Sequence, residues 1–275
     1  MIMKETKAKV SVLMPNYNSG PFIKEAIESV LAQTYENFEL LVFDDASEDE
    51  SFAVAEKMAL QDKRIKLFKH RKNQGIAKTR NDLIRKLSSS SQYIAWLDAD
   101  DLADPQRLSM QLEFLESHPE IALCGSSIRL INQHGDTIGA VEYPPEPEQI
   151  KNKFMEFNQL AQSSVMIRKE VVLQVGFYDE SLRRAEDYDY FARVLQKYNA
   201  YNFKEPLISY RLHEGQGKFT RSFESIKSSL IVRKRYLFMK DFFSFKALGI
   251  FAGYLVLLLL PRFVVYNLYK YAFSR

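Results

Sequence analysis

Three carboxylates stand within four residues, directly after a short apolar run. The run is residues 93–97, and Asp98, Asp100 and Asp101 follow it. An apolar run with aromatic and β-branched members is typical of a buried strand, and such carboxylates at its end lie where open α/β sheets bind ligands. Adjacent oxygen ligands suit a hard divalent cation, Mg²⁺ or Mn²⁺. An acidic turn that caps the next helix is the alternative interpretation.

The elements that must position these acids alternate along the first half. Apolar runs at residues 10–15, 38–43 and 65–68 each end in a polar turn and are followed by residues at helical spacing. Ser47 and Glu50 form the pattern of a capping box for the second helix. This alternation predicts an α/β fold with a parallel or mostly parallel sheet and helices on both faces.

Beyond residue 120 the pattern is less regular. Residues 128–131 and 137–141 flank a turn-forming segment and are expected to pair as a hairpin. Residues 163–167 are a further strand candidate, and Glu186 and Asp187 open a segment with helical spacing. We expect this second half to complete the same domain.

Composition limits the remaining possibilities. The 275 residues, 46% of them hydrophobic, are enough for one large domain or two small ones. The single cysteine, Cys124, rules out an internal disulfide, and it lies in an apolar run without a basic neighbour, which indicates a core thiol and not a nucleophile. Residues 1–9 are polar and lack a signal peptide pattern, so we expect the chain to stay on the cytoplasmic side.

The C-terminal tail differs in charge from the rest of the chain. From Lys218 to Arg275, eleven Lys or Arg stand against two acids, a formal +9, which leaves −6 for residues 1–217. Residues 247–260 carry no charge, but they are fewer than the roughly twenty that span a bilayer as a helix. We expect a helix or helical hairpin in the membrane interface, attracted by anionic lipid. A terminal helix packed on the core is the alternative.

Taken in order, the motifs resemble those of the family 2 glycosyltransferases, which are inverting enzymes with the GT-A fold. A lone Asp-x-Asp would be weak evidence, whereas five ordered motifs at plausible spacings are strong evidence. The motifs are residues 10–18, residues 44–47, residues 73–77 with Arg80 and Asn81, residues 98–101, and residues 186–187.

The resemblance implies a domain organisation. Residues 1–217 would form the GT-A domain, with a nucleotide-binding half at 8–120 and an acceptor half at 121–217. Beyond the resemblance, the charge and the apolar run of residues 218–275 predict a basic, helical, membrane-associating tail.

The resemblance also implies a metal site. Asp100 would ligate Mn²⁺ or Mg²⁺ on the diphosphate of the donor, and Asp98 would assist by holding a metal-bound water or the ribose. His213, in a Tyr-Arg-x-His segment, would complete the set of ligands. The cation would stabilise the charge of the leaving nucleoside diphosphate.

Five residues would bind the nucleotide-sugar. Asp45 would accept a hydrogen bond from the base, most simply from N3–H of uracil, and Tyr17 would stack on the ring. Pro15 would shape the pocket, Asn73 belongs to the third motif, and Arg80 would neutralise phosphate. A helix-capping turn, a packing aromatic and a solvated helix arginine are the respective alternatives for Asp45, Tyr17 and Arg80.

The catalytic pair would be Asp187, as general base, with Glu186 before it. An inverting transfer needs one carboxylate to take the proton of the attacking hydroxyl. The start of a helix favours a low pKa, so proton affinity must come from burial or from the acceptor. An acid that only satisfies the helix dipole is the alternative.

These roles imply transfer from a nucleotide-sugar, expected to be a UDP-sugar, to a lipid-linked or membrane-proximal glycan at the cytoplasmic face of the inner membrane, as in bacterial surface-polysaccharide assembly. No nucleic acid partner is expected. The Gln-x-x-Arg-Trp signature of processive synthases is absent, which favours single addition. A sugar nucleotidyltransferase, an aspartyl phosphatase and a membrane-docked binding module without turnover remain alternatives. The first would need a glycine-rich basic loop after the first strand, and the second usually has its Asp-x-Asp there.

Overall fold

A single mixed sheet runs through the part of the chain that the computed structural model describes, residues 10–213, 222–261 and 264. Its strands are β1 (Val10–Asn16), β2 (Phe38–Asp44), β3 (Ile65–Lys69), β4 (Tyr93–Trp96), β5 (Leu102–Ala103), β6 (Ile121–Ile131), β7 (Thr137–Val141), β8 (Met166–Arg168) and β9 (Asn199–Arg211). The helices are α1 (Ile23–Leu31), α2 (Ser51–Gln61), α3 (Ile76–Arg85), α4 (Arg107–Ser117), α5 (Pro147–Lys153), α6 (Lys169–Val175), α7 (Glu186–Leu195), α9 (Ser222–Tyr236) and α10 (Phe245–Leu259), with a 3₁₀ turn at Gln162–Ser164.

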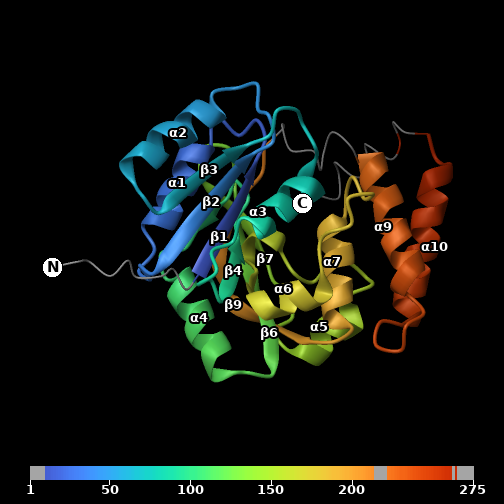
Figure 1. The fold of residues 1–275 in the computed structure, drawn as a ribbon. Helices are drawn as coiled ribbons and strands as arrows, with labels where there is room; N and C mark the ends of the chain where they lie inside the picture. Colours follow the sequence, from blue (N-terminus) through green and yellow to red (C-terminus); the bar gives the residue numbers. More distant parts are fainter. Residues whose placement is uncertain (1–9, 214–221, 262–263, 265–275) are drawn as a thin grey trace.

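The strand order is β3-β2-β1-β4-β8-β6-β9-β5, with β7 paired to β6 (Figure 1). The pairs among β1, β2, β3 and β4 are parallel. Strand β8 joins this half to β6 through antiparallel pairs on both of its sides, and β9 runs parallel to β6. The predicted α/β class, with its mostly parallel sheet and flanking helices, is confirmed.

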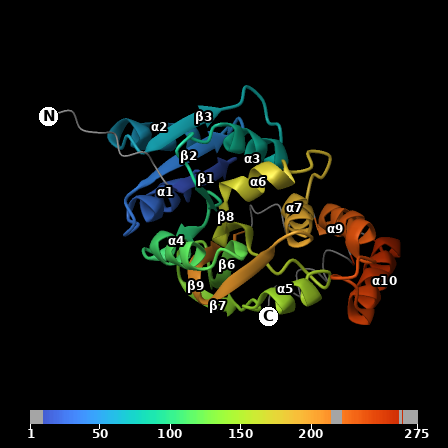
Figure 2. The same ribbon diagram turned by 60° about the horizontal axis from the view of Figure 1, so that its bottom comes forward.

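Side-chain alternation along the central strands builds a core on each face of the sheet. In β1, Leu13 belongs to one core, whereas Val12 and Met14 belong to the other. The core around Leu13 is completed by α3, α5, α6, α7 and α9, and the opposite core by α1, α2 and α4 (Figures 1 and 2). Because β1, β2, β3 and β4 are parallel, their carboxyl ends lie at one edge of the sheet. The predicted site residues that follow these strands stand at this edge.

The predicted capping box at the start of α2 is wrong. The helix begins at Ser51, and no side chain caps it. Asp44 Oδ2 accepts the backbone N–H of Ser47 at 3.0 Å and holds the turn after β2, while the Ser47 hydroxyl oxygen accepts the N–H of Asn18 at 3.0 Å. The serine is thus engaged across the strand ends and is not free to cap the helix.

The second half differs from prediction in three of its strands. The hairpin of β6 and β7 is confirmed, but β6 begins at Ile121, seven residues before its first pair with β7 at Ile128. The candidate strand at 163–167 starts as the 3₁₀ turn, and only β8 pairs in the sheet. Strand β9 was not predicted, because Pro206 and its charged neighbours interrupt the alternation that reveals a strand, and its pairing with β6 shifts register in that region.

The tail divides into two different helices. Helix α9 and the segment after it pack in the same core as Leu13, through Val232, Tyr236, Leu237 and Phe242. The alternative of a helix packed on the core therefore holds for α9. Helix α10 packs on α9 at the end of the molecule (Figure 1). No helix in the described ranges is long and apolar enough to cross a membrane. The boundary at residue 217 stays a prediction.

Candidate active site

The Asp-x-Asp acids lie at the carboxyl end of β4, as predicted. Strand β4 stands between β1 and β8, and the chain then turns so that the N–H of Asp101 donates to the carbonyl of Asp98 at 3.1 Å. The hydroxyl oxygen of Ser163 accepts the N–H of Asp98 at 3.1 Å. The side chains of Asp98 and Asp100 are 30% and 22% exposed, so both carboxylates can be reached by a ligand.

His213 is brought to Asp100 from a distant part of the chain. Its Nε2 lies 3.1 Å from Asp100 Oδ2, and its ring lies against Phe22, with centroids 4.6 Å apart. The segment before it is anchored on the acidic turn by Arg211, whose backbone N–H donates to Asp101 Oδ1 and whose Nε donates to the Asp100 carbonyl, both at 3.0 Å. The pairing of Asp100 with His213 is therefore part of the fold.

These side chains suit a cation that arrives with a phosphate ligand. Among the described residues, no group of three or more His, Cys, Asp or Glu side chains is arranged to hold a metal ion alone. Mg²⁺ in phosphoryl sites is usually held by one or two carboxylates together with substrate phosphates. Asp100, Asp98 and the His213 imidazole offer a donor set of that kind.

Asp101 has a different role from its neighbours. It is fully buried, and burial raises the pKa of its carboxyl well above the ordinary value, with a further contribution from Asp100. Its Oδ1 accepts the Arg211 N–H described above. Asp101 fixes the turn and the end of β9, and does not face a ligand.

Arg80 joins the acidic turn to the start of α7. This side chain of α3 is 5% exposed; its Nη2 lies 3.2 Å from Asp98 Oδ1, and its Nη1 donates to Glu186 Oε1. Burial opposes the charge of Arg80, but the carboxylates of Asp98 and Glu186 more than offset it, so the pKa of Arg80 is raised. The guanidinium bonds two protein carboxylates here, and its predicted contact with phosphate stays a prediction.

Glu186 is the buried acid at the first position of α7. Burial raises its pKa to about 7; Arg80 opposes this effect and Asp187 adds to it. One guanidinium has to serve several carboxylates, which explains why attraction does not offset burial at this position. The structure thus places Glu186 beside Arg80 and Asp98.

Asp187 follows at the second position of the helix and is partly exposed. Its Oδ2 accepts a hydrogen bond from Asn158 Nδ2 at 3.1 Å, and its Oδ1 accepts the N–H of Tyr188 at 2.8 Å. Burial raises the pKa of Tyr143 to about 12, and the negative charge of Asp187 adds to that shift. The predicted base therefore lies close to Asn158 and Tyr143, which both belong to the acceptor half.

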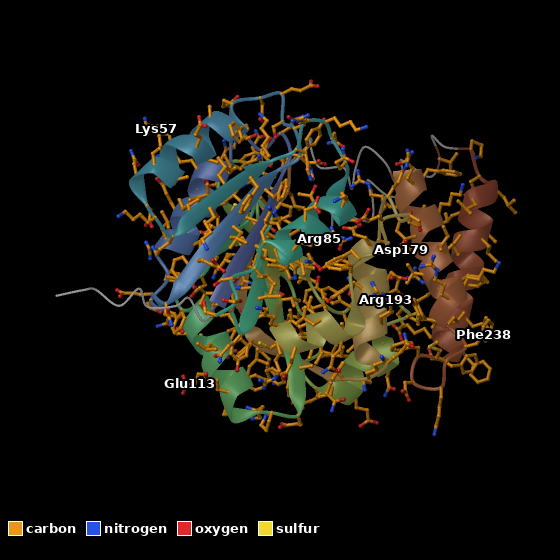
Figure 3. The ribbon with its side chains drawn as sticks, viewed as in Figure 1. Lys57, Arg85, Glu113, Asp179, Arg193 and Phe238 are labelled. Atoms are coloured by element: carbon orange, nitrogen blue, oxygen red, sulfur yellow. The ribbon has the colours of Figure 1, made fainter. Side chains whose placement is uncertain are left out.

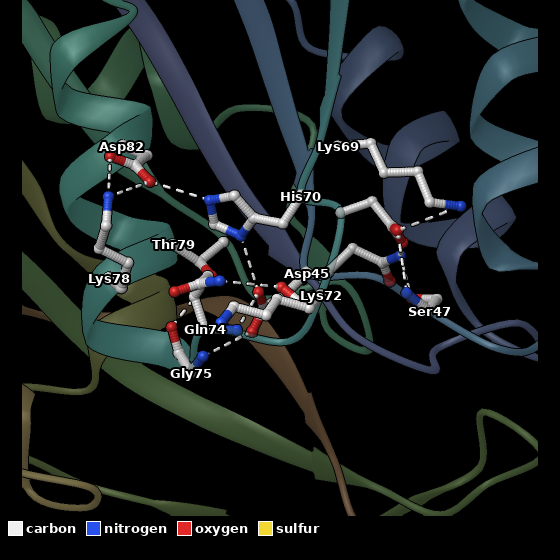
Figure 4. Close-up of polar contacts among 12 residues, drawn as sticks. Asp45, Ser47, Lys69, His70, Lys72, Gln74, Gly75, Lys78, Thr79 and Asp82 are labelled. Atoms are coloured by element: carbon white, nitrogen blue, oxygen red, sulfur yellow. Dashed lines mark hydrogen bonds and ion pairs between the residues drawn. The ribbon is translucent and has the colours of Figure 1, made fainter.

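Asp45, after β2, is held by the turn that leads into α3 (Figure 4). Its Oδ1 accepts the N–H of Gln74 at 2.7 Å and lies 2.7 Å from His70 Nδ1, and its Oδ2 accepts the N–H of Gly75 at 2.8 Å. Gly75 has a φ of 89°, a conformation that glycine adopts without strain. Three of the roughly four acceptor positions of the carboxylate are occupied, which leaves one on Oδ2.

A pocket of about 770 Å³ opens in front of this turn. Tyr17, which is 48% exposed, and Asn73 are among its lining residues, as are His70 and Lys72. Pro15 is buried in β1 opposite Phe43, and Asp45 is 3% exposed; neither is among the residues that line the pocket, although Ala46 is. The structure thus gathers Tyr17, Asn73 and Asp45 at one end of the sheet edge and the Asp-x-Asp acids at the other.

Several residues that hold this site together were not predicted from the sequence. They are His70, Asn158, Ser163 and Arg211. Arg211 stands inside the Tyr-Arg-x-His segment, which was a signal for it. Asn158 and Ser163 act through contacts with residues far away in the sequence, and no local pattern announces such contacts.

The nucleotide-binding half, the acidic turn and the acceptor half define the class of protein. The fold is shared with TarS of S. aureus in complex with UDP-GlcNAc (TM-score 0.69, 19% identity, 90% of this chain and 71% of that chain). It is also shared with the mannosyltransferase PcManGT from Pyrobaculum calidifontis, in complex with GDP-Man and Mn²⁺ (TM-score 0.65, 14% identity, 98% and 74%). The chain therefore has a GT-A fold.

Sequence comparison identifies the family. Residues 11–176 match the glycosyl transferase family 2 model. A Bacillus subtilis protein named as a glycosyltransferase, EpsE, is 34% identical over 231 residues, which are 82% of this chain and 80% of its own length. An uncharacterised glycosyltransferase of Methanocaldococcus jannaschii is 29% identical over 284 residues, 96% of this chain and 94% of its own. The chain belongs to glycosyltransferase family 2 and is a glycosyltransferase, as the motifs predicted.

Proposed function

We propose that this protein transfers a sugar, with inversion, from a nucleoside diphosphate sugar to a hydroxyl of a glycan acceptor, with Mn²⁺ or Mg²⁺ as cofactor. The observation that carries the proposal is the convergence of Asp100 with His213 and of Asp98, through Arg80, with the start of α7. The complexes of TarS with UDP-GlcNAc and of PcManGT with GDP-Man and Mn²⁺ support this donor class and cofactor.

The pocket of about 770 Å³ takes the nucleoside end of the donor. Asp45 is buried next to the pocket-lining Ala46 and keeps one unused acceptor position on Oδ2, which suits a base that carries an N–H, and we expect uracil. Tyr17 offers an exposed ring for stacking at the mouth of the same pocket.

The diphosphate lies towards the Asp-x-Asp turn. Asp100 and His213 would hold the cation, with Asp98 beside them, and the bound ion would stabilise the negative charge that develops on the leaving diphosphate. Arg80 fixes the orientation of Asp98 from behind, because its guanidinium is buried and bonded to Asp98 and Glu186.

Asp187 is the proposed general base. Asn158 and the start of α7 orient its carboxylate, so that an acceptor hydroxyl between α7 and the acidic turn can transfer its proton to Asp187 while it attacks the sugar. Glu186 holds Arg80 and is itself too buried to meet the acceptor.

The acceptor is proposed to be a lipid-linked or membrane-proximal glycan. A second pocket, of about 550 Å³, is lined by Tyr143, Phe157, Gln159 and Lys246. Phe157 and Gln159 flank Asn158, which contacts Asp187, and the buried Gln159 Oε1 has no partner in the described structure. An exposed aromatic ring and an unpaired acceptor are features that suit a sugar. The exposed apolar face of α10 supports a position at the cytoplasmic face of the inner membrane.

The experiment that tests the proposal is the variant Asp100→Asn, which keeps the shape of the side chain and removes its charge. We expect turnover to fall by about 10²-fold or more, since the cation that would stabilise the leaving diphosphate loses its charged ligand. The readout is release of free UDP or GDP from UDP-GlcNAc and GDP-mannose with Mn²⁺ present.

Asp136→Asn is the matched control, because Asp136 lies in the exposed turn between β6 and β7. It should leave turnover unchanged. An Asp100→Asn protein that unfolds like the parent and still turns over at the parent rate would refute the metal role.

A further inference from the structure

His70, directly after β3, has a carboxylate at each ring nitrogen (Figure 4). Its Nδ1 lies 2.7 Å from Asp45 Oδ1, and its Nε2 lies 2.8 Å from Asp82 Oδ2. The side chain is 13% exposed, and its ring packs against Phe43, with centroids 4.4 Å apart. A histidine held on three sides in this way belongs to the fold, although one edge of it lines the nucleotide pocket.

The two contacts require a proton on each ring nitrogen if both are to be hydrogen bonds. A neutral imidazole has one N–H, so it can donate to one carboxylate and would present a lone pair to the other. Asp82 remains ionised: burial opposes its charge, but hydrogen bonds from Lys78, His70 and Arg85 lower its pKa. Asp45 accepts hydrogen bonds from two backbone N–H groups, one on Oδ1 and one on Oδ2. Both contacts are hydrogen bonds only when His70 is an imidazolium.

Of the two carboxylates that contact His70, Asp45 depends more on the proton of the ring, because Asp82 also has other cationic partners. On α3, Lys78 and Arg85 hold Asp82 independently of His70. From the turn after β3, Lys72 lines the pocket next to the ring, as do Lys69 and Arg71. When the proton leaves, Asp82 keeps two cationic partners, whereas Asp45 keeps only backbone donors.

We propose that His70, as an imidazolium, is a positioning residue that keeps Asp45 oriented towards the base of the donor, so that donor binding weakens when His70 loses its proton. The inference rests on the proposed role of Asp45 in binding the base. The ligand class is a nucleoside diphosphate sugar whose base carries an N–H.

The sign of the pH effect follows from the geometry. The protonated ring makes both hydrogen bonds, and the contribution to donor binding is lost as pH rises and the ring becomes neutral.

The experiment is calorimetric titration of the full-length protein with UDP-GlcNAc and with GDP-mannose, with Mg²⁺ and without acceptor, from about pH 5 to about pH 8. These donors carry no terminal phosphate, so no titrating phosphate monoester obscures the result. For the donor that binds, we expect the affinity of the parent to fall about 5-fold across the range, as one charge-assisted hydrogen bond becomes neutral or is lost.

His70→Asn keeps a neutral donor near the position of Nδ1 and has no proton that titrates. We expect it to bind, over the whole range, with the weaker affinity of the parent at high pH. Lys72→Gln removes a permanent charge from the same pocket, so it should weaken binding at every pH and keep the slope. His134→Asn, in the exposed β6–β7 turn, is the matched control and should behave like the parent.

Each outcome decides the inference. A flat pH profile of the parent, or an unchanged slope in His70→Asn, overturns it. Should His70→Asn fail to fold, Asp82→Asn takes its place: the loss of one anion should move the fall in affinity to lower pH, and an unmoved profile overturns the inference. Failure of both donors to bind at any pH refutes the nucleotide site itself, whereas pH-dependent binding without turnover would refute only the proposed transfer.

Discussion

At the scale of single residues, the site depends on how one guanidinium is shared. Arg80 bonds Asp98 on the donor side and Glu186 on the acceptor side. Two carboxylates with one cation leave negative charge to spare, and burial raises the pKa of Glu186 to about 7. The variant Glu186→Gln tests this distribution of charge.

Glu186→Gln should change how stability depends on pH. An acid whose pKa is raised by folding stabilises the protein fully below its ordinary value of 4.5, and that contribution is lost as pH rises through about 7. The parent should therefore lose roughly 2 kcal/mol more than the variant between about pH 5 and about pH 7. Urea unfolding at both pH values measures the difference. Parallel losses in the two proteins would show that Glu186 does not titrate there.

The predictability of the site also differs from residue to residue. Asp98, Asp100, His213 and Asp187 were expected from motifs, because their chemistry needs particular residue types after particular strands. The partners of Arg80 were not expected, since a helix arginine with buried carboxylate partners looks like any other in sequence. The role of His70 was missed for the same reason: its partners Asp45 and Asp82 are 25 and 12 positions away.

At the scale of elements, α9 is attached to the helix that carries the proposed base. On α7, Asp189 is buried and accepts hydrogen bonds from Arg235 Nη1 at 2.9 Å and from the Tyr236 hydroxyl at 3.0 Å. The guanidinium of Arg233 is buried and donates to the carbonyls of Met155 and Glu156. These contacts connect the tail to the acceptor half.

Two truncations separate the roles of the tail helices. A chain that ends before α9 loses Val232 and Leu237 from the core, about 1.5–3 kcal/mol for each side chain, in addition to the contacts of Arg233 and Asp189. The loss is a large part of the free energy of unfolding of a typical domain, so we expect no cooperative thermal transition. A chain that ends at Ser244 keeps α9 and should unfold cooperatively. A cooperative transition in the shorter chain would contradict the packing described for α9.

Some elements could be predicted and others could not. The parallel half has apolar runs that are buried on both faces, and each run gives a strong local signal. Strand β9 and helix α9 depend instead on tertiary contacts: the interior of β9 includes Lys204, Glu205 and Pro206, and α9 has three basic residues in its last turn. Their local sequence resembles loop or tail, and only packing against β6 and α7 decides their structure.

At the scale of the whole molecule, exposed apolar side chains gather at the end formed by α9 and α10. Phe238, Phe243 and Phe245 lie in and next to the loop between these helices and are 70%, 42% and 83% exposed. Phe238 projects from the end of the molecule (Figure 3). Leu255 and Leu259 on α10 are exposed as well, and Lys240 and Lys246 stand nearby in the sequence.

We expect this end to bind anionic lipid. The parent should sediment with phosphatidylglycerol vesicles, and less so in about 1 M salt, where charge attraction is screened within about 3 Å. The double variant Phe238→Ser with Phe245→Ser should bind less because it buries less apolar area. Leu60→Ser on α2, where the side chain is 86% exposed, is the matched control. Equal sedimentation of the parent and the double variant would exclude this end as the contact.

The packing of α9 into the core limits how far the active site can move relative to a membrane that the tail binds. A flexible linker would let the active site take many positions above the bilayer. Helix α9 instead has fifteen residues, is about 22 Å long and is hydrogen-bonded to α7. The contacts with α7 are made by Arg235 and Tyr236, at the end of α9 next to Phe238, so a membrane that holds this end would fix the height and tilt of Asp187. The reach of the enzyme would then be limited by the length of its acceptor and not by the freedom of its tail.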